Sequence, residues 1–461
     1  MTLSVRRAAE ARGAAPALVF DSETLTWDEV HRALPAIERE QAALTLVAGR
    51  DRATILSIFA AIDARLPFAP LHPRATPDEL VAMRAVLSSL SDLSGVPDVP
   101  DVPDVQAGGD ASDEAPLAYV FTSGSTGAPR AAILSRRAFI ASARASADNL
   151  AYGPGDRWLL AMPLSHVGGL SVLTRTLMAG ATAVVTPEGP MSAEELVRRM
   201  AHAEVTYASL VPAMLTRVLR AGLEAPPGLR AVLIGGAPAT RALLAGAREA
   251  GWPVLPTYGS TETCSQVATR ATGDVLDTDG RIGRPLPGVD LRIEDGEIYV
   301  RGPMLFDGYI GATSSPEVSG FDDDGYFATG DLGDLDAEGV LWVRGRRSEL
   351  IITGGENVYP AAVEAVLSAH PEVVEACVYG LPDADWGEVV AAVYRSATGP
   401  IPDLDDWLRE RLAPHRRPKR LSCVNHLAEL PKTSSGKVDR AALRRRALEG
   451  SEPDGSEDGE P

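Results

Sequence analysis

The pattern that decides the fold lies in ELVRRMAHAEVTYASLVPAMLTRVLRAG, residues 195–222. Apolar residues recur at helical spacing over 195–204, a β-branched run follows over 205–211, and a second helical pattern covers 213–222. The apolar run RAVLIGG at 230–236 then predicts a buried strand that ends in a glycine turn. Strands that alternate with helices in this way predict a largely parallel sheet and therefore the α/β class.

The pattern changes twice further along the chain. Short alternating strands with Pro-Gly and Asp-Gly turns occupy 281–344 and predict a β-rich subdomain. A strand-helix pattern then restarts, beginning around GRRSEL at 345–350. We therefore expect a large N-terminal domain of packed α/β sheets plus this subdomain over 1–345, and a small C-terminal α/β domain over 346–449.

Composition and charge narrow the class of protein. The 461 residues are 45% hydrophobic, which is enough for a sizeable core. The 44 basic and 63 acidic residues give a net charge of −19, which argues against a nucleic-acid partner. Six acids fall in 96–116, whose VPDVPDVPDV repeat predicts a surface loop, and five fall in 450–461, which we expect to be a disordered acidic tail.

The cysteines and the apolar stretches indicate the cellular compartment of the protein. Cys264, Cys377 and Cys423 lie far apart and form no CxxC or Cys/His cluster, so neither a disulfide framework nor a zinc site is expected. The most apolar stretch, around 158–185, contains a histidine and an arginine and is a poor membrane span. We expect a cytoplasmic protein without a membrane span.

The sharpest local signal is YVFTSGSTGAPRAAILS, residues 119–135. After a predicted strand end, two glycines stand among four hydroxyl residues. Such a loop can turn backbone N–H groups and hydroxyls towards a polyphosphate, although a plain surface turn has the same composition. It is not the Walker loop, because the lysine of that motif is absent.

This loop resembles the phosphate-binding signature of the acyl-adenylate-forming superfamily, which includes acyl-CoA synthetases, luciferases and peptide-synthetase adenylation domains. Four further segments are similar to that family's motifs and follow in the family's order: YGSTETCSQ (258–266), YFATGDLG (326–333), GRRSELIITGGENVYP (345–360) and LPKTSSGKVDR (430–440). Residues 1–118 match only loosely. The resemblance implies that the chain activates a carboxylic acid with ATP and Mg²⁺ and passes the acyl group to a thiol such as CoA.

The resemblance also implies where ATP binds. Adenylation brings a carboxylate to a phosphate, so the site needs Mg²⁺, a mobile cation and fixed donors. The expected phosphate, adenine and ribose contacts are Thr122, Ser123, Gly124, Ser125, Thr126, Gly127, Gly235, Gly236, Ala237, Tyr258, Gly259, Thr261, Asp331 and Arg346. Taken singly, Asp331 also fits an Asx turn and Arg346 an exposed charge.

Three residues are the expected catalytic groups. Glu262 offers a carboxylate oxygen to Mg²⁺, and His166 takes the family's position near the acyl carboxylate. Lys437 would bridge the substrate carboxylate and the α-phosphate. In a chain with 41 arginines and three lysines, a lysine here agrees with a need for a compact ammonium, although a solvated surface lysine is the common alternative.

The thiol half-reaction implies further positions. The family rotates its small domain about a hinge, so the domain 346–449 is expected to be mobile, with Ser348 at the hinge. Many relatives carry an acidic residue at that position, and this chain departs from them. Gly354 and Gly355 would line the CoA tunnel. Three arginines, Arg416, Arg417 and Arg420, could meet CoA phosphates or form a solvated face.

The segment MPLSHVGGLSVLTRTLMAG, residues 162–180, is expected to contact the carboxylic acid substrate and so indicates its chemical class. No aspartate stands where amino-acid-activating relatives hold an ammonium. Arg175 must either point outward or meet an anion, which would be a second substrate carboxylate. With His166 and Arg175, we expect Ser209, Ser260 and Thr263 at the substrate. The alternatives are another aryl-, acyl- or dicarboxylate-CoA ligase, or a stand-alone adenylation protein that loads a carrier protein.

Overall fold

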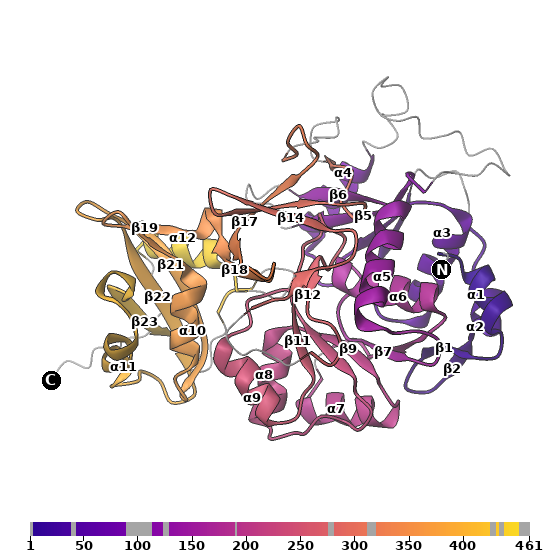
Figure 1. Cartoon of the computed structure of the whole chain (residues 1–461), viewed down its shortest axis with the longest axis horizontal. Helices are drawn as coiled ribbons and strands as arrows, with labels where there is room; N and C mark the ends of the chain where they lie inside the picture. The colour runs from indigo at the N-terminus through magenta and orange to yellow at the C-terminus, as the bar shows by residue number, and fades with distance from the viewer. Residues whose placement is uncertain are drawn as a thin grey trace.

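The computed structural model describes residues 3–37, 43–88, 113–122, 129–189, 191–274, 281–310, 320–424, 430–432 and 438–450. These residues form four sheets (Figure 1). Three sheets belong to the first 346 residues, and the fourth lies in a smaller C-terminal lobe, drawn in orange and yellow. The α/β class is confirmed.

The largest sheet has the strand order β13-β12-β11-β10-β9-β7-β8-β1-β2. Neighbours from β11 to β1 are parallel, and β2, β12 and β13 are antiparallel to their partners. The predicted strands at 205–211 and 230–236 are β9 and β10, which pair in parallel. The bounds are β1 Pro16–Val19, β2 Thr24–Thr26, β7 Arg157–Leu160, β8 Thr182–Val185, β9 Tyr207–Leu210, β10 Ala231–Ile234, β11 Val254–Tyr258, β12 Ala268–Thr269 and β13 Arg284–Pro285.

Helices cover both faces of this sheet because successive side chains of each strand point to opposite faces. In β7, Trp158 and Leu160 pack into the core that contains α5 (Arg136–Leu150) and α6 (Val167–Ala179). Leu159 packs into the opposite core, with α7, α8 and α9. Those helices are α7 Ala193–His202, α8 Pro212–Arg220 and α9 Arg241–Glu249, and the first two match the predicted helices to within two residues.

A five-stranded sheet with the order β16-β6-β5-β4-β3 carries the phosphate-loop motif. Strands β5 and β6 pair antiparallel, so Thr122 stands opposite Arg130 and the segment 123–128 connects them. That segment lies outside the described residues. The bounds are β3 Leu44–Val47, β4 Phe68–Leu71, β5 Pro116–Thr122, β6 Arg130–Ser135 and β16 Tyr309–Ile310, with helices α1 Val5–Arg12, α2 Trp27–Arg32, α3 Arg52–Ala64 and α4 Pro77–Ser88.

The predicted β-rich region forms an antiparallel sheet, β14-β15-β17-β18. Its strands are β14 Asp290–Glu294, β15 Glu297–Arg301, β17 Phe327–Leu335 and β18 Leu341–Arg346. This sheet leads directly into a short 3₁₀ turn, η2, at Arg347–Glu349, which begins the connection to the C-terminal lobe.

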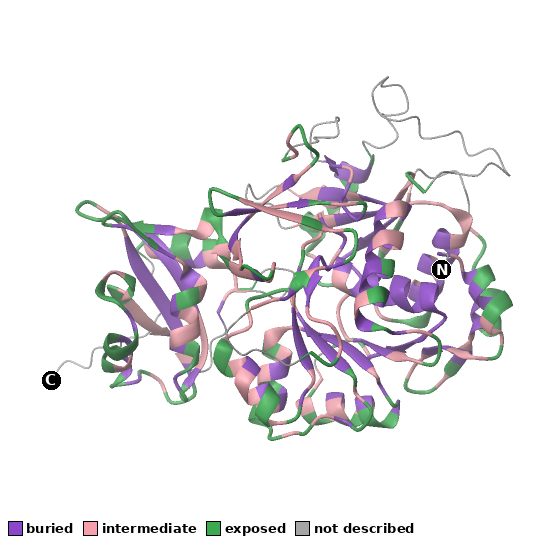
Figure 2. Cartoon of the chain, in the orientation of Figure 1, coloured by how far each residue is buried: buried purple, intermediate pink, exposed green. Residues whose placement is uncertain are grey.

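The C-terminal lobe has a sheet of its own in the order β20-β19-β22-β21, with β23 beside β22. Buried purple residues follow its long central strands in Figure 2, where two apolar clusters lie. Arg220 of α8 reaches this lobe and donates to the Val373 carbonyl at 3.0 Å. The bounds are β19 Ile351–Thr353, β20 Glu356–Val358, α10 Pro360–Ser368, β21 Val373–Asp383, β22 Gly387–Ser396, α11 Leu404–Arg411, η3 Pro414–Arg416, β23 Arg420–Val424 and α12 Arg440–Leu448.

Within the part of the chain that is described, no helix combines the length and the apolarity that crossing a bilayer requires.

Candidate active site

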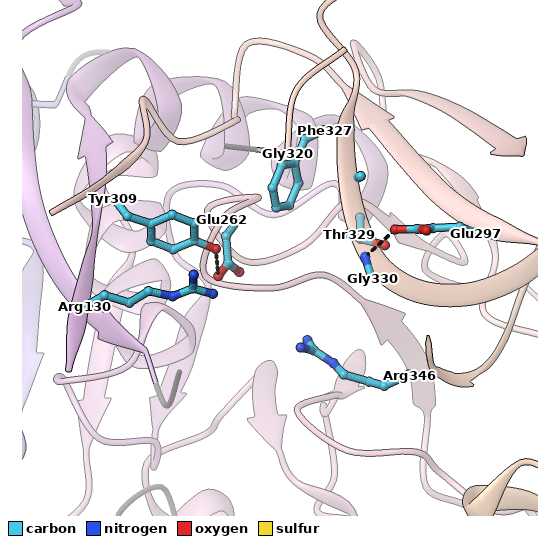
Figure 3. Close-up of a pocket in the computed structure, with 10 residues that line it drawn as sticks. Arg130, Glu262, Glu297, Tyr309, Gly320, Phe327, Thr329, Gly330 and Arg346 are labelled. Carbon is cyan, nitrogen blue, oxygen red and sulfur yellow. Dashed lines mark hydrogen bonds between the residues drawn. The ribbon is translucent and has the colours of Figure 1, made fainter. Parts of the chain in front are cut away.

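A cavity of about 240 Å³ opens where the phosphate-loop sheet, the 258–266 segment and the β-rich sheet meet (Figure 3). Its walls come from positions far apart in the chain. They are Arg130, Glu262, Glu297, Tyr309, Gly320, Phe327, Ala328, Thr329, Gly330 and Arg346. Four of the five motif segments therefore supply residues to one cavity.

Charge in the cavity is arranged around Glu262. Figure 3 shows the guanidinium groups of Arg130 and Arg346 approaching from opposite sides. Arg130 lies 4.0 Å from the ring centre of Tyr309, and the Tyr309 hydroxyl donates to Glu262 Oε1 at 2.6 Å. Two fixed cations beside the Glu262 carboxylate suit a polyphosphate that arrives with a divalent cation, because Mg²⁺ is commonly held by one or two carboxylates and the phosphates themselves.

The segment 258–266 folds as a tight turn at the end of β11. The Thr263 hydroxyl accepts from the Ser260 N–H at 2.8 Å and lies 3.1 Å from the Ser265 carbonyl oxygen. Cys264 and Ser265 adopt left-handed backbone angles, with φ of 48° and 91°. Such strain is characteristic of functional sites, where the surrounding structure maintains it. The turn holds Glu262 at the cavity and leaves Thr261 half-buried beside it.

Gly259 is required by this turn. A Cβ at this position would lie 1.5 Å from the Ser265 carbonyl oxygen. We expect Gly259→Ala to lower the free energy of unfolding by about 3 kcal/mol, since the backbone must move. Gly153→Ala is the control, because no atom lies within 4 Å of its Cβ position. Urea unfolding measures both variants, and equal stability would contradict the close approach.

Asp331 is held between two partners in the ribose motif. The Tyr258 hydroxyl donates to Asp331 Oδ2 at 2.9 Å, and Arg346 Nε lies 2.9 Å from Oδ1. Burial raises the pKa of Asp331, and Arg346 opposes that shift. The Asx-turn alternative is wrong, because this carboxylate faces Tyr258 and Arg346 rather than its own backbone. Arg346 is exposed but paired. A carboxylate has lone pairs beyond these two bonds, so it can still accept from ribose hydroxyls.

The remaining predicted ATP contacts are only partly described. Gly235, Gly236 and Ala237 follow β10, and Gly236 takes a left-handed φ of 78°. The Thr122 hydroxyl at the end of β5 is buried and has no hydrogen-bond partner among the described residues. An oxygen in that state fits a phosphate ligand. The predicted contacts Ser123, Gly124, Ser125, Thr126 and Gly127, and also Lys437, lie outside the described residues.

Arg175 is buried, so the outward-pointing alternative is wrong. It is 2% exposed, lies 5.3 Å from the Trp158 ring centre, and donates to Gln266 Oε1 and Ser265 Oγ at 3.4 and 3.5 Å. Among the described residues it makes no ion pair with a carboxylate. Burial lowers the pKa of this guanidinium, and Tyr152 acts in the opposite direction. The protein therefore holds a cation in its interior, in contact with the segment that carries Glu262.

The other predicted substrate residues lie around the same region. Ser209 accepts from the Trp158 indole N–H at 3.2 Å. His166 immediately precedes α6 and packs against His72, with ring centres 5.4 Å apart. Ser260 and Thr263 belong to the 258–266 turn, and the Thr263 hydroxyl is bonded within that turn. The substrate roles of these residues remain predictions.

The predicted hinge and CoA residues lie beyond β18. Ser348 is exposed in the 3₁₀ turn, and Gly354 and Gly355 form the β19–β20 turn with φ of 58° and 82°. A Cβ at Gly354 would lie 2.7 Å from the Trp386 ring. Arg417 donates to the carbonyls of Leu412 and Arg409. Arg416 and Arg420 are exposed.

Sequence reasoning missed several walls of the cavity. Arg130 begins β6 and was a detectable signal, because it is the only basic residue in the segment 119–135. Tyr309 enters through the pairing of β16 with β6, which no local pattern indicates. Glu297 stands in an ordinary hairpin sequence, so only its contacts reveal it.

The cavity brings together, on this α/β scaffold, residues from the segments that were predicted to bind a nucleotide. A family model described as AMP-binding enzyme matches residues 86–310, and one described as AMP-binding enzyme C-terminal domain matches 362–437. With the relatives that follow, the chain belongs to the AMP-binding enzyme family and is an AMP-forming acid–thiol ligase. The sequence-based family resemblance is confirmed.

Several relatives of the chain are ligases that act on one particular acid. A 2-succinylbenzoate–CoA ligase of Bacillus licheniformis is 40% identical over 336 residues, covering 70% of this chain and 69% of that protein. One of Bacillus subtilis is 38% identical over 343 residues, covering 72% and 69%. The solved o-succinylbenzoate CoA synthetase of Bacillus subtilis with its acyl-adenylate intermediate superposes with a TM-score of 0.82 at 31% identity, covering 96% and 98% of the two chains. A structure of that protein with ATP and magnesium ion gives 0.82 at 31%, covering 95% and 98%.

Proposed function

We propose that this chain joins 2-succinylbenzoate to CoA at the expense of ATP, releasing AMP and pyrophosphate. The observation that carries the substrate assignment is Arg175, a cation in the interior that has no carboxylate partner among the described residues. A lone buried charge is costly, and a substrate with a second carboxylate would remove that cost. The segments SHVGGLSVLTR and TETCSQVATR, which contact each other through Arg175, also resemble those of 2-succinylbenzoate–CoA ligases.

The first half-reaction uses the cavity. The reacting carboxylate of the acid attacks the α-phosphorus of ATP, and the bond to pyrophosphate breaks. Arg130 and Arg346 offset the phosphate charge from two sides, and Asp331 holds the ribose. Glu262 is the residue that would hold Mg²⁺, which neutralises the phosphates when bound. Lys437 bridges the two anions in this proposal.

The second half-reaction needs the C-terminal region. We propose that the regions on either side of Ser348 move as two domains, 1–345 and 346–449, and that the CoA thiol reaches the acyl carbon beside Gly354 and Gly355. The thiolate attacks that carbon, and AMP leaves. Ion pairs on each side of the turn support this pivot. Arg346, two residues before Ser348, pairs with Asp331 of the N-terminal region. Glu349, the residue after Ser348, pairs with Arg440 of the C-terminal lobe.

This activity would place the chain in menaquinone biosynthesis. We further propose a cytoplasmic location, since Cys264, Cys377 and Cys423 are all free thiols and the substrates are ATP and CoA.

The experiment offers the purified chain 2-succinylbenzoate, benzoate, a medium-chain fatty acid and a mixture of amino acids. Each reaction contains ATP, Mg²⁺ and CoA, and both pyrophosphate release and thioester are measured. We expect kcat/KM for 2-succinylbenzoate to exceed that for benzoate by about 10²-fold or more, because only the former has a partner for Arg175. Equal turnover of benzoate would contradict the substrate assignment. Adenylate formation without CoA thioester would favour a carrier-loading protein.

A further inference from the structure

The four-stranded sheet contains a local irregularity at the ribose motif. Strand β15 pairs with β17, but the register shifts between Glu297 and Tyr299. Glu297 stands opposite Leu332, whereas Tyr299 stands opposite Ala328. A bulge of this kind interrupts the ladder with the partner strand, and here the positions of β17 that are left without a partner on β15 are Thr329, Gly330 and Asp331.

Side chains replace the missing ladder bonds. The Gly330 N–H donates to Glu297 Oε1 at 2.9 Å, and the Asp331 N–H donates to the Thr329 hydroxyl at 3.1 Å. Gly330 has a φ of 71°, which only glycine adopts without strain. The shape of the turn that presents Asp331 therefore depends on the Glu297 carboxylate.

The other oxygen of the same carboxylate is bonded to the start of the interdomain connection. Arg347 Nε lies 2.9 Å from Glu297 Oε2, and Arg347 Nη2 donates to the Asp295 carbonyl at 3.3 Å. Arg347 is the residue before Ser348. The residue after it, Glu349, is paired instead with Arg440 of the C-terminal lobe. Arg347 is therefore bonded to the N-terminal region and Glu349 to the C-terminal lobe, with only Ser348 between them.

We propose that Glu297 is a positioning residue that couples binding of the nucleotide ribose to the conformation of the hinge at Ser348. It does so through its bond to Gly330 on one side and its ion pair with Arg347 on the other. The Glu297 side chain is 12% exposed and lines the cavity, whereas the Arg347 side chain that it pairs with is half-exposed. When the ribose turn, residues 329–331, closes on a bound nucleotide, the ion pair between Glu297 and Arg347 becomes stronger. When the chain turns at Ser348 and withdraws Arg347, the ribose turn loosens. This inference rests on the ATP site proposed above.

Equilibrium binding tests the coupling without requiring turnover. Calorimetry compares the affinities for ATP and for 2′-deoxy-ATP, each with Mg²⁺, in the full-length chain. The parent is expected to prefer ATP by about tenfold, the scale of one hydrogen bond to a charged group. Glu297→Ala leaves the Gly330 N–H unpaired, so ATP affinity should fall about tenfold and the preference for ATP to about twofold.

Two milder variants separate the contacts of Glu297. Glu297→Gln keeps an acceptor for Gly330 but loses the charge that attracts Arg347, and Arg347→Met removes the same ion pair from the other side. Each is expected to weaken ATP binding about threefold, the scale of a half-exposed pair. Because both remove one interaction, the double variant should also be about threefold weaker rather than ninefold. Thermal unfolding verifies that each variant is folded.

Arg344→Met is the matched control. Arg344 lies on β18, three positions before Arg347, and it pairs with Asp334 of β17 rather than with the ribose turn. Its ATP affinity should equal that of the parent. Unchanged affinity in Arg347→Met, or a ninefold loss in the double variant, would overturn the coupling. A chain that shows the expected binding pattern yet fails to use 2-succinylbenzoate would support the coupling and contradict only the substrate assignment.

Discussion

Arg175→Met is expected to lower kcat/KM for 2-succinylbenzoate by about 10³-fold. Removing one partner of a buried charge pair commonly costs 2 to 5 kcal/mol or more, and methionine fills the space without offering a charge. Benzoate has no second carboxylate, so its slow turnover should change by less than about threefold. Steady-state kinetics with both acids measures the difference, and a parallel loss with both acids would contradict a role in binding the second carboxylate.

The same variant has a second expected outcome in the absence of substrate. Because Arg175 is a buried cation without a carboxylate partner in the described residues, its removal should leave the free energy of unfolding unchanged or raise it by about 1 kcal/mol. 2-Succinylbenzoate should then raise the melting temperature of the parent but not that of the variant.

Arg230→Ala is the matched control for this pair of measurements. Arg230 also lies over an aromatic ring, at 5.1 Å from Tyr207, but it pairs with Asp156 at 3.0 Å and is half-exposed. Its kinetics with 2-succinylbenzoate should match those of the parent. A large effect there would show that the aromatic cluster, rather than the buried charge, governs activity.

Lys437→Ala is expected to depress acid-dependent pyrophosphate exchange by at least about 10²-fold. Losing one preorganised charge at the reacting phosphate has effects of this size. Thioester formation from preformed acyl-AMP should fall much less, because no carboxylate then needs to approach a phosphate. Equal losses in the two assays would refute the assigned role.

Lys432→Ala is the control for that variant. Lys432 lies five positions earlier in the same motif, and its ammonium pairs with Glu375 of β21. Its substitution should leave pyrophosphate exchange within about twofold of the parent, as expected for a surface ion pair. A comparable loss in both lysine variants would point to disruption of the whole segment.

Local sequence patterns predicted much of this protein. Helical spacing and β-branched runs placed β9, α8 and β10, and turn residues marked the β-rich region, because periodicity and turn chemistry are set within a few residues of chain. The motif segments identified the family, which the comparisons confirmed. The choice between an outward and an inward Arg175 stayed open, since a helical position alone does not say which face is covered.

The sequence by itself determined the α/β class, the order of the motif segments and the kind of chemistry, because each is written in short, contiguous runs of residues. Only the tertiary structure decided that Arg175 is buried against Trp158, that Tyr309 bonds to Glu262, and that Glu297 joins Gly330 to Arg347. The physical reason is that these contacts join residues distant in the chain. Strand pairing such as β16 with β6, and the register shift between β15 and β17, bring them together, and no local pattern specifies either.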